Sequence, residues 1–116
     1  GDGSQRRDCL HVDDVVDALV RCTGASGIGS VFNIGTTDHH SLAEIAQLMA
    51  ELGGAGTEVV TTEWPDAYQR IDIGSFETDS SAAATELGWR AVTPLRDGLA
   101  RTLSFYREHP WYLSSI

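Results

Sequence analysis

The stretch GDGSQRRDCLHVDDVVDAL, residues 1–19, decides how the fold begins. Residues 1–4 favour a turn and residues 8–11 a short extended piece. Apolar residues then follow at helical spacing, namely Val12, Val15, Val16, Leu19 and Cys22. Asp13 and Asp14 would lie in the first turn of this helix, where negative charge suits the helix macrodipole. The stretch therefore predicts a helix that starts near residue 12 and ends near Gly24.

The middle of the chain predicts one helix between two strands. SVFNI, residues 30–34, has the composition of a short buried strand, and TEVVTTEW, residues 57–64, also has strand composition. Between them, Ser41 and Glu44 form the pattern of a capping box. The helix that it opens should stop at Gly53 or Gly54. Residues 65–78 read as mixed loop and short extended pieces.

Two more helices are predicted towards the end of the chain. Asp79 or Ser80 should cap a small helix that runs through Leu87. Thr93 followed by Pro94 is an N-cap with proline at the first helical position, and this last helix should reach about residue 109. Four helices and two or three short strands do not alternate regularly enough for a complete doubly wound sheet. We therefore expect one α+β domain over residues 1–116 that is part of an α/β protein.

Composition limits the classes of function. The chain has 116 residues, is 41% hydrophobic and carries a net charge of −9, which argues against nucleic acid as a partner. No apolar run approaches the length of a membrane span, so we expect no membrane partner. Cys9 and Cys22, in a chain with no visible secretory signal, read as free thiols in a cytoplasmic protein. Gly1 in place of Met indicates that the natural N-terminus is missing or processed.

Arginine supplies all eight basic residues, and the chain has no lysine. The planar fork of an arginine side chain matches phosphate oxygens, and Arg6 and Arg7 follow a Gly-rich turn, where such a fork can hold a diphosphate. The alternative is a surface ion pair with Asp8 or Asp2, because such pairs are common and weak.

Three further residues are candidates for binding. Arg70 can meet a phosphate or balance Asp72. Asn33 lies within the apolar VFNIG, and an unpaired buried amide costs about 1–3 kcal/mol. Its partner can be a ligand or the backbone of a neighbouring loop.

Other familiar sites are not indicated. His11, His39, His40 and Cys9 do not have the spacing of a metal site. The glycines of TGASGIGS, residues 23–30, follow a helix and precede a strand, the reverse of the order in a dinucleotide-binding loop.

Four pieces, in this order and spacing, resemble one family. They are GDGSQRRDCLHVDDVVDAL, VFNIGTTDHHSLAEIAQLM, RIDIGSFETDSSAAATELGW and PLRDGLARTLSFYREH. Together they look like the C-terminal, substrate-binding part of the extended short-chain dehydrogenase/reductases, the NAD-dependent nucleotide-sugar epimerases and dehydratases. The resemblance implies a small C-terminal subdomain of a Rossmann-type enzyme, with the Rossmann core absent from this chain.

The resemblance assigns roles to individual residues. Arg7 matches the arginine of the family's RD pair, which contacts the diphosphate of the nucleotide sugar. Arg70 falls near the family's second phosphate-contacting arginine, and Asp72 near an acidic residue that can contact the ribose. Asp14 matches an aspartate that we interpret as structural. The residue after the RD pair is usually aromatic in the family, whereas here it is Cys9, which should loosen the local packing.

The family's catalytic residues have no counterpart here. Its NAD-binding glycine loop and its Tyr-x-x-x-Lys pair lie upstream of the matching segment, and a chain without lysine cannot supply the latter. The resemblance therefore implies a non-catalytic, nucleotide-sugar-binding portion of an isomerase or lyase, whose NAD is bound by a missing N-terminal domain. We expect partners of three kinds, which are a nucleotide-diphosphate sugar, the missing Rossmann domain and a second copy of the chain. The alternative is a stand-alone binding or interaction module derived from the same segment.

Overall fold

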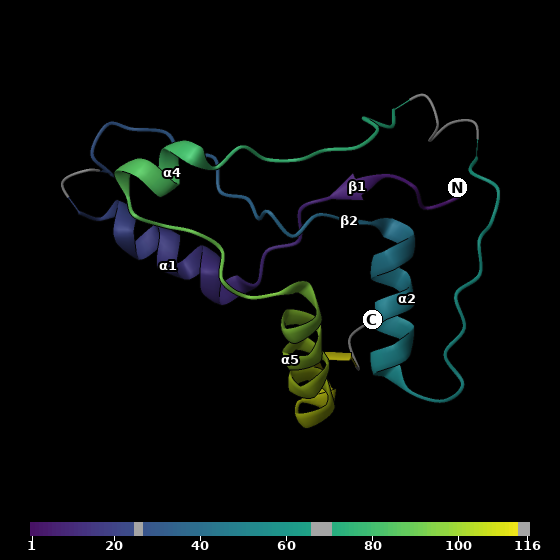
Figure 1. The fold of residues 1–116 in the computed structure, drawn as a ribbon. Helices are drawn as coiled ribbons and strands as arrows, with labels where there is room; N and C mark the ends of the chain where they lie inside the picture. Colours follow the sequence, from purple (N-terminus) through teal and green to yellow (C-terminus); the bar gives the residue numbers. More distant parts are fainter. Residues whose placement is uncertain (25–26, 66–70, 114–116) are drawn as a thin grey trace.

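The computed structural model describes residues 1–24, 27–65 and 71–113, and Figure 1 shows their arrangement. Along the chain the elements are β1 (Arg6–Arg7), α1 (Val12–Cys22), β2 (His40–Ser41), α2 (Leu42–Gly53), α4 (Ser81–Glu86), α5 (Leu95–Glu108) and the 3-10 helix η2 (Pro110–Leu113). The four α-helices lie where the sequence predicts them. Helices α1 and α4 lie together at one side of the molecule, α5 stands in the middle beside α2, and β1 and β2 lie above α5 and α2 in this view (Figure 1).

The helix starts show which capping predictions hold. The capping box of α2 is confirmed, because Ser41 Oγ accepts from the Glu44 amide at 3.1 Å and Glu44 Oε2 accepts from the Ser41 amide at 2.7 Å. The expected Thr93 cap of α5 is wrong. Pro94 occupies the N-cap position, and the Leu95 amide donates to Asp38 Oδ2 at 3.0 Å. The cap of α5 thus comes from a residue 57 positions earlier in the chain.

The strands differ from those expected. β1 and β2 pair antiparallel, with Arg6 opposite Ser41 and Arg7 opposite His40. On the other side of β1, the Phe76 amide donates to the Arg6 carbonyl at 3.0 Å, so residues 71–79 run beside this short ladder (Figure 1). Residues 30–34 and 57–64 form no strand among the described residues. The predicted burial of residues 30–34 holds only in part, because Phe32 and Ile34 are partly buried against the core whereas Val31 is 93% exposed. An extended segment without a pairing partner cannot complete a ladder.

The core lies between α1 and α4. Ala18, Ala83 and Trp89 are buried there and pack against Phe32 and Ile34 among others. The Trp89 indole Nε1 donates to the Asp14 carbonyl at 2.9 Å. The buried Asp14 carboxylate also accepts from the Thr93 amide at 3.0 Å. These contacts agree with the structural interpretation of Asp14.

The molecule is open for its length. Its radius of gyration is 17.0 Å, against about 13 Å for a compact domain of this size. Large apolar side chains are exposed over much of the surface, with Ile28, Val31, Val92, Ile71 and Ile73 each more than 70% exposed. No helix in the described part of the chain is long and apolar enough to cross a membrane. The structure is thus a small, mainly helical α+β piece, in line with the predicted fold class in its coarse form.

Candidate functional site

Arg7 is the centre of the candidate site. It is the second residue of β1, and its side chain is 28% exposed. Its Nη1 donates to the carbonyl oxygens of Arg6 at 2.8 Å and Gly74 at 2.5 Å, and its Nη2 lies 3.5 Å from Asp72 Oδ1. Within the described residues, Nε donates to no acceptor. A guanidinium has five N–H donors in a planar fork, so part of this fork stays available to a ligand.

Asp72 reaches Arg7 from a segment 65 residues further along the chain. Its side chain is only 18% exposed, which reduces the screening of this ion pair by water. The structure therefore brings together two of the four residues that the sequence predicts for the site. Neither Asp8 nor Asp2 is the ion-pair partner of Arg7 in the described residues, so the partners suggested by the sequence for a simple surface pair are wrong.

Arg6 has different surroundings although it is the next residue along the strand. Its Nε forms an ion pair with Glu77 Oε1 at 2.8 Å, and its Nη2 donates to the His39 carbonyl at 3.0 Å. The Arg6 and Glu77 side chains are 46% and 47% exposed, so this pair lies largely in solvent. The two arginines of RRD are therefore distinguishable, one half-buried and the other a surface ion-pair residue.

Of the other two predicted site residues, the structure describes only Asn33. Asn33 is exposed rather than buried in a strand, so the structure does not require the expected protein partner for its amide. Arg70 lies outside the described residues. Its proposed role as a second phosphate-binding residue stays a prediction.

A cluster beside Arg7 was missed by the sequence analysis. It consists of Asp8, His39 and Glu77. His39 Nε2 lies 3.2 Å from Asp8 Oδ1, and His39 Nδ1 lies 3.5 Å from Glu77 Oε1. No sequence signal identifies it, because residues 8, 39 and 77 lie in three separate segments and share no motif spacing.

Close backbone packing supports this cluster. Gly35 is buried, and a Cβ added to it would lie 2.3 Å from Thr78 Cβ and 2.9 Å from Asp8 Oδ2. A side chain at position 35 would therefore separate the segments that form the cluster. The Thr78 amide donates to Asp8 Oδ2 at 2.7 Å, which fixes the carboxylate from its other side.

Two titrating groups near the site are shifted by their surroundings. The backbone hydrogen bond from Leu95 lowers the pKa of the Asp38 carboxyl, helped by the hydrogen bond with His40. Burial raises the pKa of the Cys9 thiol, with a further contribution from the negative charge of Asp8. Cys9 is therefore a poor nucleophile at neutral pH.

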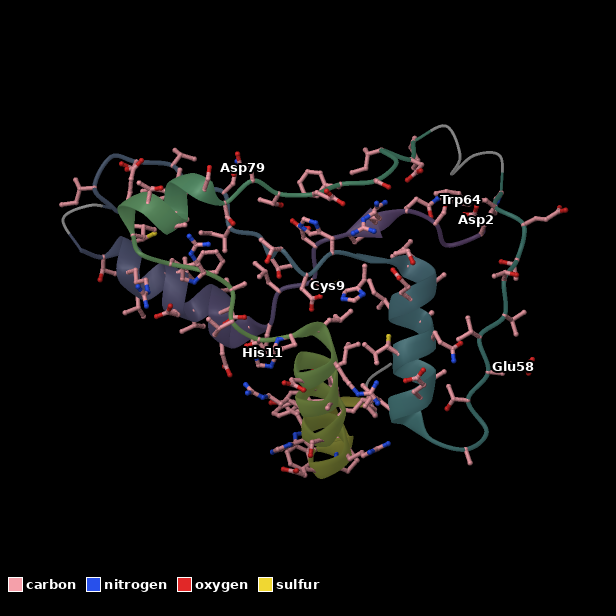
Figure 2. All side chains as sticks on the ribbon, viewed as in Figure 1. Asp2, Cys9, His11, Glu58, Trp64 and Asp79 are labelled. Atoms are coloured by element: carbon pink, nitrogen blue, oxygen red, sulfur yellow. The ribbon has the colours of Figure 1, made fainter. Side chains whose placement is uncertain are left out.

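A cavity of about 270 Å³ lies between the start of α1 and α5, where Cys9 and His11 line it together with Leu95 and Gly98. Figure 2 labels Cys9 and His11 along the chain that leads from β1 into α1. In the part of the chain that the structure describes, no group of three or more histidine, cysteine or acidic side chains is arranged to hold a metal ion.

Comparison with known proteins gives consistent results. Residues 1–35 match the model of the NAD dependent epimerase/dehydratase family. A UDP-glucose 4-epimerase of Mycolicibacterium smegmatis is 38% identical over 110 residues, which are 93% of this chain and 33% of the relative. The chain spans about a third of the length of this curated relative.

Solved structures agree with the sequence matches. A UDP-glucose 4-epimerase of Thermotoga maritima with UDP-glucose is 31% identical and superposes with a TM-score of 0.81 over 94% of this chain and 34% of that one. An enzyme of Bordetella bronchiseptica in complex with NAD+ and UDP is 27% identical, with a TM-score of 0.77 over 99% of this chain and 32% of that one. By sequence and by fold, this chain is therefore homologous to a segment of the NAD-dependent epimerases and dehydratases of the extended short-chain dehydrogenase/reductase family.

Proposed function

We propose that this chain is the nucleotide-sugar-binding portion of an NAD-dependent sugar epimerase or dehydratase, and that Arg7 binds the diphosphate. One observation carries the proposal. Arg7 occupies the position that the family resemblance assigns to the diphosphate, and it is half-buried beside Asp72 with part of its fork open. An arginine in this setting offers charge and two parallel hydrogen bonds to a phosphate.

The neighbours of Arg7 orient it for this task. The Gly74 and Arg6 carbonyls both accept from Nη1, which fixes the plane of the guanidinium. Asp72 Oδ1 faces Nη2, and a carboxylate has a second oxygen that can accept from a ribose hydroxyl. Asp72 would thus hold Arg7 and contact the nucleoside. Arg70, which precedes Asp72 by two residues, would add a second phosphate contact, and the exposed Asn33 would offer its amide to the ligand.

NAD would be held by other parts of the enzyme. The chain has no lysine, and among its described residues no glycine-rich loop joins a strand to a following helix. This chain covers only about a third of an enzyme that was solved with NAD+ and UDP. This agrees with the two ligands being bound by different parts of one protein. The exposed apolar side chains of α1 and of residues 28–31 would pack against that NAD-binding part.

The alternative hypothesis is that the chain is a stand-alone binding module. The coding sequence upstream of Gly1 distinguishes this module from a portion of an enzyme. A strand, a glycine-rich loop and a helix followed by Tyr-x-x-x-Lys would support the enzyme. A start codon immediately before Gly1 would support the module.

Titration tests the proposal directly. UDP-glucose and dTDP-glucose would be titrated calorimetrically into the full-length protein and into the isolated 116-residue chain. We expect the full-length protein to bind a nucleotide sugar and the chain alone neither to bind NAD tightly nor to turn over any sugar nucleotide. Absence of nucleotide-sugar binding to the full-length protein would contradict the proposal, and epimerase activity of the isolated chain would overturn its non-catalytic assignment.

A further inference from the structure

His39 connects two carboxylates that belong to different parts of the site. Its Nε2 lies 3.2 Å from Asp8 Oδ1, at the end of β1, and its Nδ1 lies 3.5 Å from Glu77 Oε1, on residues 71–79. The side chains of His39 and Asp8 are 18% and 8% exposed. Neither Nε2 nor Asp8 Oδ1 makes a well-aligned hydrogen bond to any described residue. The 3.2 Å contact between these two buried polar atoms is therefore the interaction that can compensate for their burial.

The protonation state of the ring decides whether both contacts are favourable. A neutral imidazole has one N–H donor, so its second nitrogen presents a lone pair. With a carboxylate at each nitrogen, one contact of the neutral ring is repulsive. The imidazolium carries an N–H at both nitrogens and a positive charge, so both contacts become attractive ion pairs.

The segment that His39 holds is the one that completes the Arg7 site. Asp72 and the Gly74 carbonyl, which contact Arg7, lie on the same run of residues as Glu77. The Thr78 amide is bound to the other oxygen of Asp8 at 2.7 Å. Loosening the contact between His39 and Glu77 therefore loosens the position of Asp72 and Gly74 against β1.

From this geometry we propose that His39 is a pH-dependent positioning residue for nucleotide-sugar binding. Its imidazolium clamps residues 71–79 onto β1, and loss of its proton weakens the clamp and with it the affinity for the nucleotide sugar. The inference rests on the proposed function of Arg7 but concerns a different residue, and a readout without nucleotide tests it separately.

Charged groups face His39 from each neighbouring element. Asp8 approaches from the end of β1 and Glu77 from residues 71–79. Arg6 shares Glu77 with the ring and also donates to the His39 carbonyl. On its own segment, the negative charge of Asp38 also interacts with His39. Three carboxylates and one guanidinium thus surround the ring.

The experiment measures affinity against pH in the full-length protein. UDP-glucose is the probe, because its diphosphate has no terminal phosphate that titrates near neutral pH, unlike UDP. We expect the dissociation constant to rise about fivefold between about pH 5.5 and about pH 8, across the ordinary titration range of histidine. His39→Gln cannot form an imidazolium, so it should bind at the weaker level throughout and show no such pH dependence.

A matched control is the adjacent histidine. His40 Nε2 lies 2.8 Å from Asp38 Oδ1. In the part of the chain that the structure describes, no side-chain hydrogen bond or ion pair joins His40 to residues 71–79. His40→Gln should keep the pH dependence of the wild type. Glu77→Gln provides a second test, because the new amide can donate to a neutral Nδ1, and the pH dependence should shrink although His39 is intact. This variant keeps the proposal testable if His39→Gln does not fold.

Hydrogen exchange supplies the readout that needs no ligand. The amides of Phe76 and Thr78, bound to the Arg6 carbonyl and to Asp8, should lose protection as the pH rises, after correction for the intrinsic exchange rate. A wild type that binds no nucleotide sugar at any pH but shows this loss would refute the proposed function and support the clamp. Wild-type affinity and protection that do not change with pH, or a pH dependence that survives in His39→Gln, would overturn the inference.

Discussion

Replacing Arg7 by alanine should weaken nucleotide-sugar binding strongly. Nη1 is committed to two carbonyl oxygens, so a diphosphate would meet Nε and the outer face of Nη2. The contact to Asp72 at 3.5 Å is long for a hydrogen bond and can open to a phosphate. Hydrogen bonds to a charged group are worth about 1.5–3 kcal/mol. Because each 1.4 kcal/mol is tenfold, Arg7→Ala should raise the dissociation constant by about 10- to 150-fold.

Two further variants separate contact from structure. Arg7→Lys should restore binding only in part, because an ammonium keeps the charge but cannot form the fork. Arg6→Ala should have a much smaller effect on affinity than Arg7→Ala, since Arg6 is 46% exposed and influences the site through its ion pair with Glu77. The assay is calorimetric titration of UDP or dTDP into the full-length protein and its variants, repeated at several salt concentrations. NAD affinity is the control and should barely change.

The effects of Arg7→Ala and Arg6→Ala together show which arginine binds the diphosphate. Arg7→Ala should also flatten the salt dependence of the dissociation constant, because one fewer cation would meet the phosphates. If Arg6→Ala weakens binding and Arg7→Ala does not, the assignment is displaced by one residue. If neither variant changes the affinity, the diphosphate assignment is wrong and both arginines are structural ion-pair residues.

Three other predictions concern the fold. The isolated chain should associate in solution, because Val31 and its neighbours expose apolar surface, and a single species of 12.5 kDa in concentrated sedimentation runs would contradict this. Asp38→Ala removes the cap of α5 and should cost about 0.5–2 kcal/mol in urea unfolding. Since the pKa of Asp38 is lowered on folding, its contribution is present above the ordinary carboxyl pKa of about 3.9 and is lost as the pH falls below it, so wild type and variant should converge there. Trp89→Phe removes the indole hydrogen bond to the Asp14 carbonyl, which keeps its helical donor within α1, and should cost about 0.5–1.5 kcal/mol, with unchanged helix content as the control by circular dichroism.

Local signals in the sequence located the helices well. The start of α2 was predictable because both partners of its capping box lie within four residues of one another. The start of α5 was misassigned, because the group that caps it, Asp38, is distant in sequence and adjacent only in space. The same distinction explains the strands. Their composition was visible in residues 30–34 and 57–64, but a strand exists only where a second segment pairs with it.

The site shows the same limit. Arg7 and Asp72 were identified through a family resemblance, and the structure adds that they contact one another across 65 residues. The Asp8–His39–Glu77 cluster has no motif spacing, because its members come from three segments. The predicted burial of Asn33 was wrong. Its neighbours in sequence are apolar, but Asn33 itself is exposed in the described structure.

The α1–α4 core and the Arg7 site are held by different forces, and this should separate the stability of the site from that of the fold. The core between α1 and α4 rests on buried apolar groups and on Trp89, which is 1% exposed. Residues 71–79 are held on β1 by a backbone hydrogen bond from Phe76, by the Ser75 hydroxyl, by the Thr78 amide on Asp8 and by carboxylate pairs, of which Arg6–Glu77 is largely exposed. Exposed pairs contribute at most about 1 kcal/mol each and are screened by salt. Salt and pH should therefore disturb the Arg7 site at concentrations that leave the α1–α4 core folded, so that changes in ligand affinity precede any loss of helix.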